Sequence, residues 1–131
     1  MRSVIIHSVM LPAPAAELFA TYMDPDRHAA LTGAPVTISA VPGSPFAAFD
    51  GSLSGTTLAV VAPVTIVQSW RSRNFHDSDP DSTLILTFVP QGSYGLIELV
   101  HLDVPAQDHQ GVDEGWEQYY WQPWREMLGA G

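Results

Sequence analysis

The 131-residue chain contains no cysteine and no lysine. Without cysteine there is no disulfide, no thiolate zinc site and no thiol nucleophile. Without lysine there is no Schiff base, no P-loop lysine and no serine–lysine dyad. No apolar run approaches the roughly 20 residues that a membrane-spanning helix needs. These absences exclude several enzyme classes before any motif is considered.

Positive charge is scarce as well, because five arginines stand against 14 acidic residues and the formal net charge is −9. A surface of this sign repels phosphate groups, so we expect no nucleic-acid partner and no anionic membrane partner. With 46% hydrophobic and 15% charged residues, the composition is that of a globular protein. The length suits one domain, residues 1–131, with one core.

The N-terminal residues resemble a signal peptide only in outline. Arg2 precedes a short apolar run and an alanine- and proline-rich segment, but His7 interrupts that run. A run this short is barely sufficient for the apolar region of a signal peptide. We therefore predict a first β-strand over residues 3–10 and a cytoplasmic protein.

The first half of the chain alternates helix and strand signals. Helical spacing covers residues 13–23, and Asp24 with Pro25 is a typical start for a second short helix that ends near Gly33. A short strand is predicted over residues 36–41. Residues 46–71 then read as a long hairpin with Gly51 and Gly55 near its start, which marks a bend, and with its turn at residues 62–65.

The second half predicts two more strands and a long helix. A polar loop over residues 72–81 leads to strands 82–89 and 94–104, joined by a turn at residues 90–93. The last element is a helix over about residues 111–128, with Asp108 as its cap and Pro123 as the cause of a kink or a disrupted third turn. Its predicted apolar face is formed by Trp116, Tyr119, Tyr120, Pro123, Trp124 and Met127. The strands follow one another in meander order, which predicts an antiparallel sheet with this helix packed on it.

The chain resembles the START-like helix-grip superfamily (SRPBCC), and most of all the family of the C-terminal domain of the activator of the heat-shock protein 90 ATPase. The stretches that carry the resemblance span nearly the whole chain: Leu18-Phe19, Asp24-Pro25, His28, Thr32-Gly33, Phe49-Asp50-Gly51, Gly55, residues 66–71, Ser82-Thr83, His101, Val104-Pro105 and residues 115–121. The resemblance implies an α+β fold. In that fold two short helices follow the first strand, and a curved antiparallel sheet of about six to seven strands grips the C-terminal helix, with a cavity between them.

The sequence departs from the family pattern at several points. Ser44-Pro45 stands where a glycine is common, Ala59 stands where an acidic residue is common, and lysine is absent throughout. Helix-grip domains include hydrophobic-ligand carriers, polyketide cyclases, co-chaperone domains and many members without assigned function, so the resemblance alone does not select an activity.

The candidate site consists of aromatic and apolar residues that would face such a cavity. We predict ligand contacts from strand residues and from the helix, namely Phe49, Trp70, Leu86, Phe88, Leu99, His101, Trp116, Tyr119 and Tyr120. Core packing is the alternative explanation for the same side chains. His101 is the candidate acid or base if it reaches the cavity, with Tyr119 or Tyr120 as its helper, and His7 is a weaker candidate of the same kind.

We expect no metal and no cofactor. The acidic loop at Asp77, Asp79 and Asp81 lacks the glycine and the final glutamate of a calcium loop. Three functions remain open: binding of a small, mainly apolar ligand, which we rank first; a cyclase-, aromatase- or hydratase-like enzyme that uses His101; and a protein-interaction or co-chaperone-like module. Edge strands also leave a homodimer open.

Overall fold

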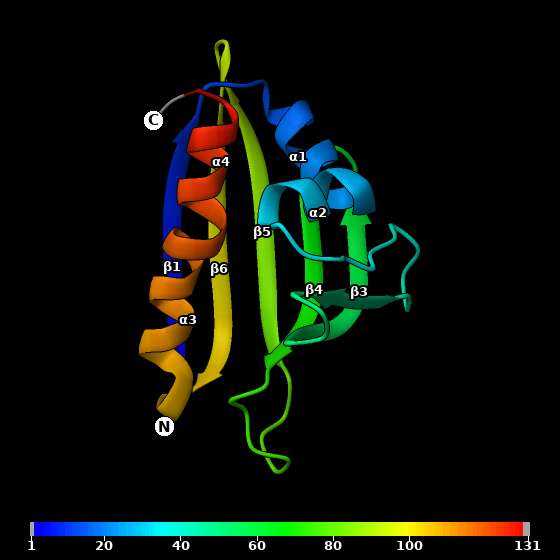
Figure 1. Ribbon diagram of the computed structural model, residues 1–131, viewed down its shortest axis with the longest axis vertical. Coiled ribbons are helices and arrows are strands. Elements are labelled where there is room, and N and C mark those ends of the chain that lie inside the picture. The colour runs from blue at the N-terminus through cyan, green and yellow to red at the C-terminus, as the bar shows by residue number, and fades with distance from the viewer. Residues whose placement is uncertain (1, 130–131) are drawn as a thin grey trace.

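The computed structural model describes residues 2–129 as one six-stranded antiparallel sheet with helices packed on it (Figure 1). The strands lie in the order β1-β6-β5-β4-β3-β2. Their bounds are β1 Arg2–Leu11, β2 Pro45–Ala48, β3 Leu53–Val61, β4 Thr65–Ser72, β5 Ser82–Gln91 and β6 Tyr94–Pro105. This arrangement confirms the predicted α+β helix-grip fold.

Strand β1 lies outside the predicted meander, which concerns the strands after the two short helices. Strands β2 to β6 do follow one another, but β1 pairs antiparallel with the last strand, with Ile5 opposite His101 and Val9 opposite Ile97. Alternation along β1 buries Ile5 and Val9 and exposes Ile6 between them. The last strand thus lies beside the first, and β1 forms one edge of the sheet.

The glycine-bent hairpin forms as expected, and Gly55 explains part of its shape. A Cβ atom added to Gly55 would lie 1.8 Å from the carbonyl oxygen of Ser69 on the neighbouring strand β4. Only glycine therefore permits this close backbone approach. Before β3, the turn carries three consecutive residues with positive φ, Phe49 (51°), Asp50 (54°) and Gly51 (85°).

The predicted strand over residues 36–41 is wrong. The segment makes a single bridge, in which Thr37 and Ala47 exchange two backbone hydrogen bonds of 2.8 and 2.9 Å. Prolines bound the segment at Pro35 and Pro42, and each lacks the N–H that a longer ladder would need. The segment thus lies beside β2 and covers that edge of the sheet at one point.

The two short helices after β1 confirm the prediction closely. Helix α1 spans Ala15–Met23 and α2 spans Pro25–Thr32. The side chain of Asp24 accepts hydrogen bonds from the backbone N–H groups of Asp26 and Arg27, and Gly33 ends α2 in the left-handed conformation. Buried residues on α1, including Leu18 and Tyr22, pack it onto the sheet.

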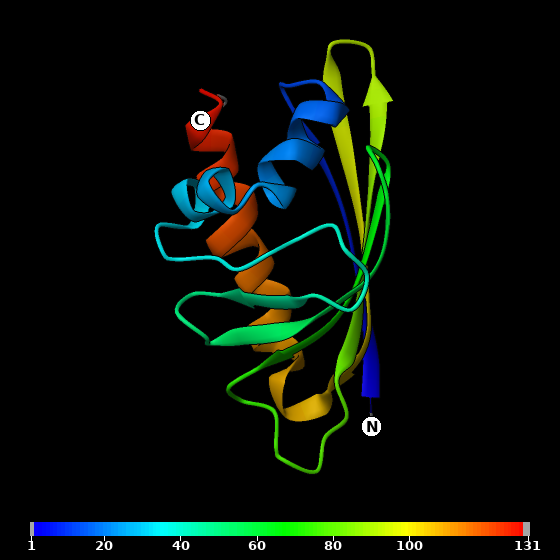
Figure 2. The same ribbon diagram turned by 90° about the vertical axis from the view of Figure 1, so that its right-hand side faces the viewer.

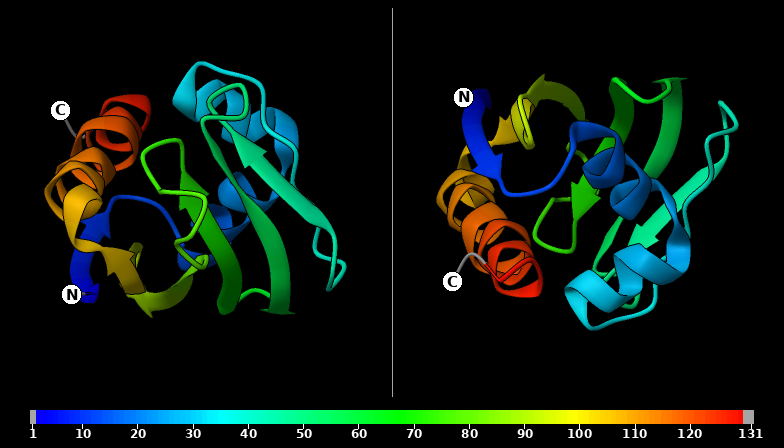
Figure 3. Two further views of the ribbon diagram at one scale, coloured as in Figure 1. Left: turned by 90° about the horizontal axis from the view of Figure 1, so that it is seen from below. Right: turned by 90° about the horizontal axis from the view of Figure 1, so that it is seen from above.

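The C-terminal helix is continuous but not uniform. It consists of α3 (His109–Trp116), a π-helical turn η2 (Glu117–Trp121) and α4 (Gln122–Met127), preceded by a 3₁₀ turn, η1 (Ala106–Asp108). Figures 2 and 3 show that this helix, α1 and α2 all lie on one side of the curved sheet. No helix within residues 2–129 is long and apolar enough to cross a membrane.

The π-helical turn corrects the predicted apolar face of this helix. Trp116, Tyr120 and Trp124 are buried as expected, but Tyr119 and Met127 are about half exposed, and Trp121 is buried instead. The wider turn brings residues five apart onto one side, so that Trp116 and Trp121 stack with their ring centroids 5.5 Å apart. Pro123 follows this turn and has no N–H to donate, as expected for the predicted disruption.

Candidate functional site

A pocket of about 540 Å³ is partly open to solvent. It lies between the strands β2 to β4, called the hairpin below, and the first half of the C-terminal helix. The β2–β3 turn and the end of β4 form one side of it, and α3 with the following turn forms the other. Its volume lies in the range of pockets that bind small molecules. The pocket is therefore large enough for a small molecule.

Aromatic side chains form the apolar wall of the pocket. Phe49 contacts Tyr119 and Tyr120 across the opening, with ring centroids 5.6 and 6.1 Å apart. Deeper in the wall, Trp116 packs on Tyr120 at 4.8 Å and on Trp70 at 6.4 Å. Phe49 adopts positive φ, which is unusual for a bulky residue and places this ring opposite the helix.

Two glycines on α3 keep the helix side of the pocket open. Gly111 and Gly115 are four residues apart, so they share one face of the helix with Tyr119, and all three line the pocket. A Cβ atom on Gly115 would meet only the ring of Tyr119, at 3.6 Å. A side chain at Gly115 would therefore project into the pocket, whereas a Cβ atom on Gly111 would lie 3.2 Å from a carboxylate oxygen of Asp108.

The polar part of the wall gathers around a buried carboxylate. Asp108 is 4% exposed, and it accepts hydrogen bonds from the Ser72 hydroxyl at 2.5 Å and from the Asn74 amide at 3.3 Å. It stands at the position before α3, but its side chain makes no capping hydrogen bond. Its predicted role as a cap is therefore wrong, because the carboxylate turns towards the end of β4 instead.

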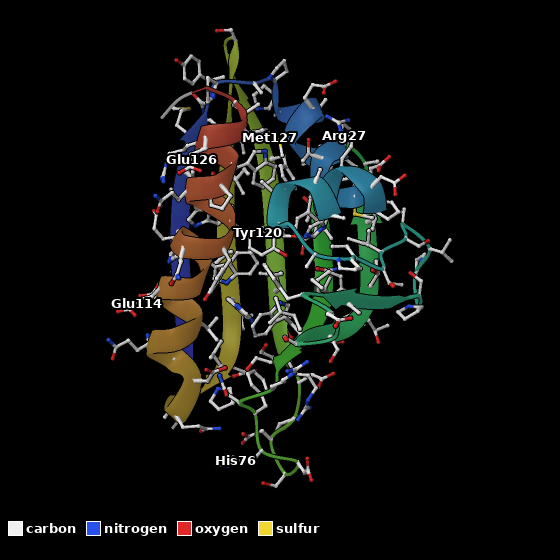
Figure 4. The ribbon with its side chains drawn as sticks, viewed as in Figure 1. Arg27, His76, Glu114, Tyr120, Glu126 and Met127 are labelled. Atoms are coloured by element: carbon white, nitrogen blue, oxygen red, sulfur yellow. The ribbon has the colours of Figure 1, made fainter. Side chains whose placement is uncertain are left out.

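Tyr120 links the pocket to a hydrogen-bond network under α1 and α2. The His28 Nδ1 atom lies 2.8 Å from the carbonyl oxygen of Tyr22, which can only accept, so Nδ1 carries the proton. The Nε2 atom then accepts from the Tyr120 hydroxyl at 2.8 Å, and the Tyr22 hydroxyl donates to Gln68 at 2.7 Å. Figure 4 shows Tyr120 pointing from the helix towards the sheet, whereas Glu114 points away.

Burial sets the protonation states of this network. It lowers the pKa of His28 to about 4, despite the opposing effect of the hydrogen bond to the Tyr22 carbonyl. Burial also raises the pKa values of Tyr120 and Tyr22 well above their usual value, with the neighbouring Tyr120 adding to the effect on Tyr22. At neutral pH all three groups are therefore uncharged, and Tyr120 keeps its hydroxyl proton.

His101 lies in the closed interior and does not line the pocket. The indole N–H of Trp116 donates to its Nδ1 at 3.2 Å. Ser82 donates its own proton to the Trp70 carbonyl at 2.6 Å and lies 2.8 Å from Nε2, so Nε2–H donates to the Ser82 hydroxyl. Burial, with a smaller effect of His7, lowers the pKa of His101 to about 3. Both ring nitrogens are thus occupied in a neutral side chain.

The pocket brings together only part of the predicted ligand-binding set. Phe49, Trp70, Trp116, Tyr119 and Tyr120 line it. Leu86, Phe88 and Leu99 lie in the core between the sheet and the helices, as His101 does. The predicted ligand contacts of all nine residues stay predictions.

The sequence did not predict several residues of the pocket lining as ligand contacts: Ser52, Leu53, Ser72, Arg73, Asn74, Asp108, Gly111, Val112 and Gly115. The spacing of Gly111, Gly115 and Tyr119 is the one signal that points to an open helix face. The polar residues belong to segments that pair only in the folded chain, so no local pattern identifies them.

His7, the weaker candidate, lies on the other side of the helix from the pocket. Its Nδ1 accepts from the Trp121 indole N–H at 2.8 Å, and its Nε2 lies 2.5 Å from an Asp113 carboxylate oxygen. These contacts join β1 to the helix. Within residues 2–129, no group of three or more histidine and acidic side chains is placed to hold a metal ion.

Comparisons with known proteins identify the family and the relatives of this chain. The sequence model of the family described as "Activator of Hsp90 ATPase homolog 1-like protein" matches residues 12–128. An uncharacterized protein of Schizosaccharomyces pombe is 31% identical over 119 residues, which is 91% of this chain and 35% of that protein. The human activator of 90 kDa heat shock protein ATPase homolog 1 is 26% identical over 128 residues, which is 98% of this chain and 37% of that protein.

A solved structure shares the whole fold. The crystal structure of an HSP90 activator from Plasmodium falciparum superposes with a TM-score of 0.87 at 22% identity, and the match covers 96% of each chain. By contrast, the chain spans only about a third of the length of the curated relatives named above.

Proposed function

The chain belongs to the family of Activator of Hsp90 ATPase homolog 1-like proteins, and on that premise we propose that it binds a small, mainly apolar ligand in the pocket between the hairpin and the C-terminal helix. The observation that carries the proposal is the pair Gly111 and Gly115, which leaves one helix face bare opposite a wall of aromatic rings. At Gly115, where an added Cβ atom would meet only the ring of Tyr119, a helix that served packing alone would gain stability from alanine. An open, aromatic-lined space is the usual form of a small-molecule site.

Native mass spectrometry of the freshly purified protein, followed by solvent extraction, tests this proposal first. We expect a reproducible non-covalent adduct and an extractable apolar compound. The variant Gly115→Leu should lose the adduct, because its side chain projects into the pocket. Gln118→Leu is the control, since it adds the same side chain at an exposed position of the same helix. A clean apo mass for the wild type, together with no binding of added aromatic compounds, would contradict the proposal.

The enzyme alternative gains no support from the position of His101. A general base needs a free nitrogen within reach of the substrate, whereas both nitrogens of His101 are hydrogen-bonded in the interior. Among the described residues that line the pocket, Tyr120 is the only titratable group that hydrogen-bonds to a second titratable group, and that partner, His28, lies behind it. The geometry therefore favours binding over acid–base chemistry.

A second candidate function is protein interaction, which the names of the relatives suggest. The observation in its favour is the apolar outer side of β1, where Val4, Ile6 and Met10 are 51, 69 and 50% exposed. Strand β1 is also an edge of the sheet. Exposed apolar side chains on a free edge strand are typical of a protein contact. This surface lies apart from the pocket, so the two functions are compatible.

A further inference from the structure

We infer that the pocket selects ligands carrying a carboxylate, with Arg73 as the group that binds it. The inference rests on the proposed function and names the chemical class of its ligand. An apolar, aromatic body would occupy the space between the rings, and the acidic group would lie at the opening.

Arg73 differs from the other arginines that the structure describes. Arg27 pairs with Glu17 at 2.9 Å, Arg71 with Asp81 at 2.6 Å and Arg125 with Glu117 at 2.6 Å. Among the arginine side chains within residues 3–129, Arg73 alone makes no ion pair, although the chain carries 14 acidic residues. Among the described residues its guanidinium therefore has no ion-pair partner, which leaves it free to bind a ligand.

The backbone fixes Arg73 at the side of the pocket. Its N–H donates to the Ser52 carbonyl at 3.0 Å, which ties it to the β2–β3 turn beside Phe49. Arg73 and Ser52 both line the pocket, and Arg73 is exposed. A guanidinium at the open side of an aromatic pocket can bind a carboxylate with two parallel hydrogen bonds while the apolar body of the ligand is buried.

A second unpaired donor lies in the same wall. Trp70 lines the pocket and is 3% exposed, and its indole N–H has no hydrogen-bond acceptor among the described residues. A buried donor without an acceptor is costly in a folded protein. This nitrogen atom is itself closed off from the pocket space, so the acidic group of the ligand is bound by Arg73 and not by Trp70.

Asp108 is the one carboxylate among the residues that line the pocket, and its negative charge would favour a cationic ligand. However, it is nearly inaccessible, and its oxygens already accept from Ser72 and Asn74. Arg73 has no such partner. With a chain of net charge −9, a general attraction of anions is excluded, so selection of a carboxylate must come from this local group.

Three matched probes test the inference by isothermal titration calorimetry: naphthalene-2-carboxylate, its neutral carboxamide, and naphthalen-2-ylmethylamine. We expect the carboxylate to bind more tightly than the other two probes. Arg73→Gln should weaken carboxylate binding by about tenfold or more, as for a lost charge-assisted hydrogen bond, and should leave carboxamide binding unchanged. Arg27→Gln is the matched control, because it removes the same charge from an exposed arginine that does not line the pocket.

The outcomes separate this inference from the proposed function. If the carboxamide or the amine binds as tightly as the carboxylate, or if Arg73→Gln and Arg27→Gln weaken carboxylate binding equally, the ligand class is overturned while the binding function stands. If no probe binds the wild type and Gly115→Leu changes nothing, the binding function fails and the inference fails with it.

Discussion

At the scale of single residues, Tyr120 is the residue on which the pocket and the interior both depend. Its ring forms part of the pocket wall, and its hydroxyl donates to His28 behind that wall. The direction of this hydrogen bond is fixed, because the Nδ1–H group of His28 donates to the Tyr22 carbonyl and leaves Nε2 as the acceptor. Tyr120 is therefore held in one orientation by a group that does not line the pocket.

Removing the Tyr120 hydroxyl should cost stability. In Tyr120→Phe the buried Nε2 of His28 has no donor, and we expect the free energy of unfolding to fall by about 1–3 kcal/mol. Tyr119→Phe is the matched control on the next residue, which is half exposed and whose hydroxyl makes no hydrogen bond within the described chain. It should change stability by less than about 0.5 kcal/mol. Urea denaturation measures both, and equal effects would show that the His28 contact does not matter.

The two buried histidines should make stability depend on pH. Burial lowers the pKa of His28 to about 4 and that of His101 to about 3 in the folded chain, against 6.5 for a free histidine. Below pH 6.5 the unfolded chain takes up protons that the folded chain does not. The contribution of each histidine to the free energy of unfolding should therefore be complete above pH 6.5. It should fall as the pH drops below 6.5, by up to about 1.4 kcal/mol per pH unit for each histidine.

Urea denaturation between pH 7.5 and 5 tests this, since most carboxylates stay ionised there in both states. The slope should correspond to uptake of up to two protons on unfolding, and to one fewer in His28→Gln. A free energy of unfolding that stays constant from pH 6.5 to 5 would contradict the assigned protonation states.

The sequence identified His101 as a special residue but not its role. A histidine between apolar neighbours on a strand is compatible with a cavity base and with a core residue alike. The choice depends on Ser82 and Trp116, which lie 19 and 15 residues away in the chain. Contacts of that kind arise only from sheet pairing and helix packing, so local patterns do not reveal them.

At the scale of elements, the C-terminal helix shows where periodicity fails. A constant rotation of 100° per residue places Tyr119 on the buried face and Trp121 off it. The π-helical turn at Glu117–Trp121 changes that rotation locally, and Trp121 is buried in place of Tyr119. Pro123 predicts an irregular turn, but a proline does not specify how the preceding residues rearrange.

Two glycines, one in a strand and one in a helix, should respond oppositely to the same substitution. Gly55→Ala places a Cβ atom against the backbone of Ser69, which cannot move away, and should cost about 3 kcal/mol. Gly115→Ala meets only open space and the Tyr119 ring, and should gain about 0.5–1 kcal/mol from better helix propensity. Thermal unfolding distinguishes them. Destabilisation by Gly115→Ala would mean that the bare helix face is needed for folding and not only for the pocket.

At the scale of the whole molecule, the sheet has one covered face and one bare face. The helices lie on the inner face (Figure 2). The buried core residues of the strands face the same side, as the alternation along the strands predicted. The pairing of β1 with β6 was not predictable from neighbouring segments, because it joins the first strand in the sequence to the last. That pairing decides which strand forms the edge, and it places Ile6 beside Val100 on the bare face.

This bare face predicts weak self-association through β1. In the sheet register Ile6, Val100, Ile85 and Val67 form one uncharged row across four strands. Two copies of an edge strand can pair antiparallel about a twofold axis. Because each copy carries a charge of −9, repulsion opposes the contact, and salt should strengthen it by screening that repulsion.

Sedimentation velocity over a range of protein and salt concentrations tests this prediction. We expect a monomer at low ionic strength and a growing dimer fraction at high salt. Ile6→Glu, at a side chain that is 69% exposed, should abolish the dimer without affecting the fold, because surface substitutions seldom change stability much. It should also leave naphthalene-2-carboxylate binding unchanged, since β1 does not line the pocket. A monomer under every condition would show that the bare face serves another partner or none, whereas a dimer that survives Ile6→Glu would place the contact elsewhere on the chain.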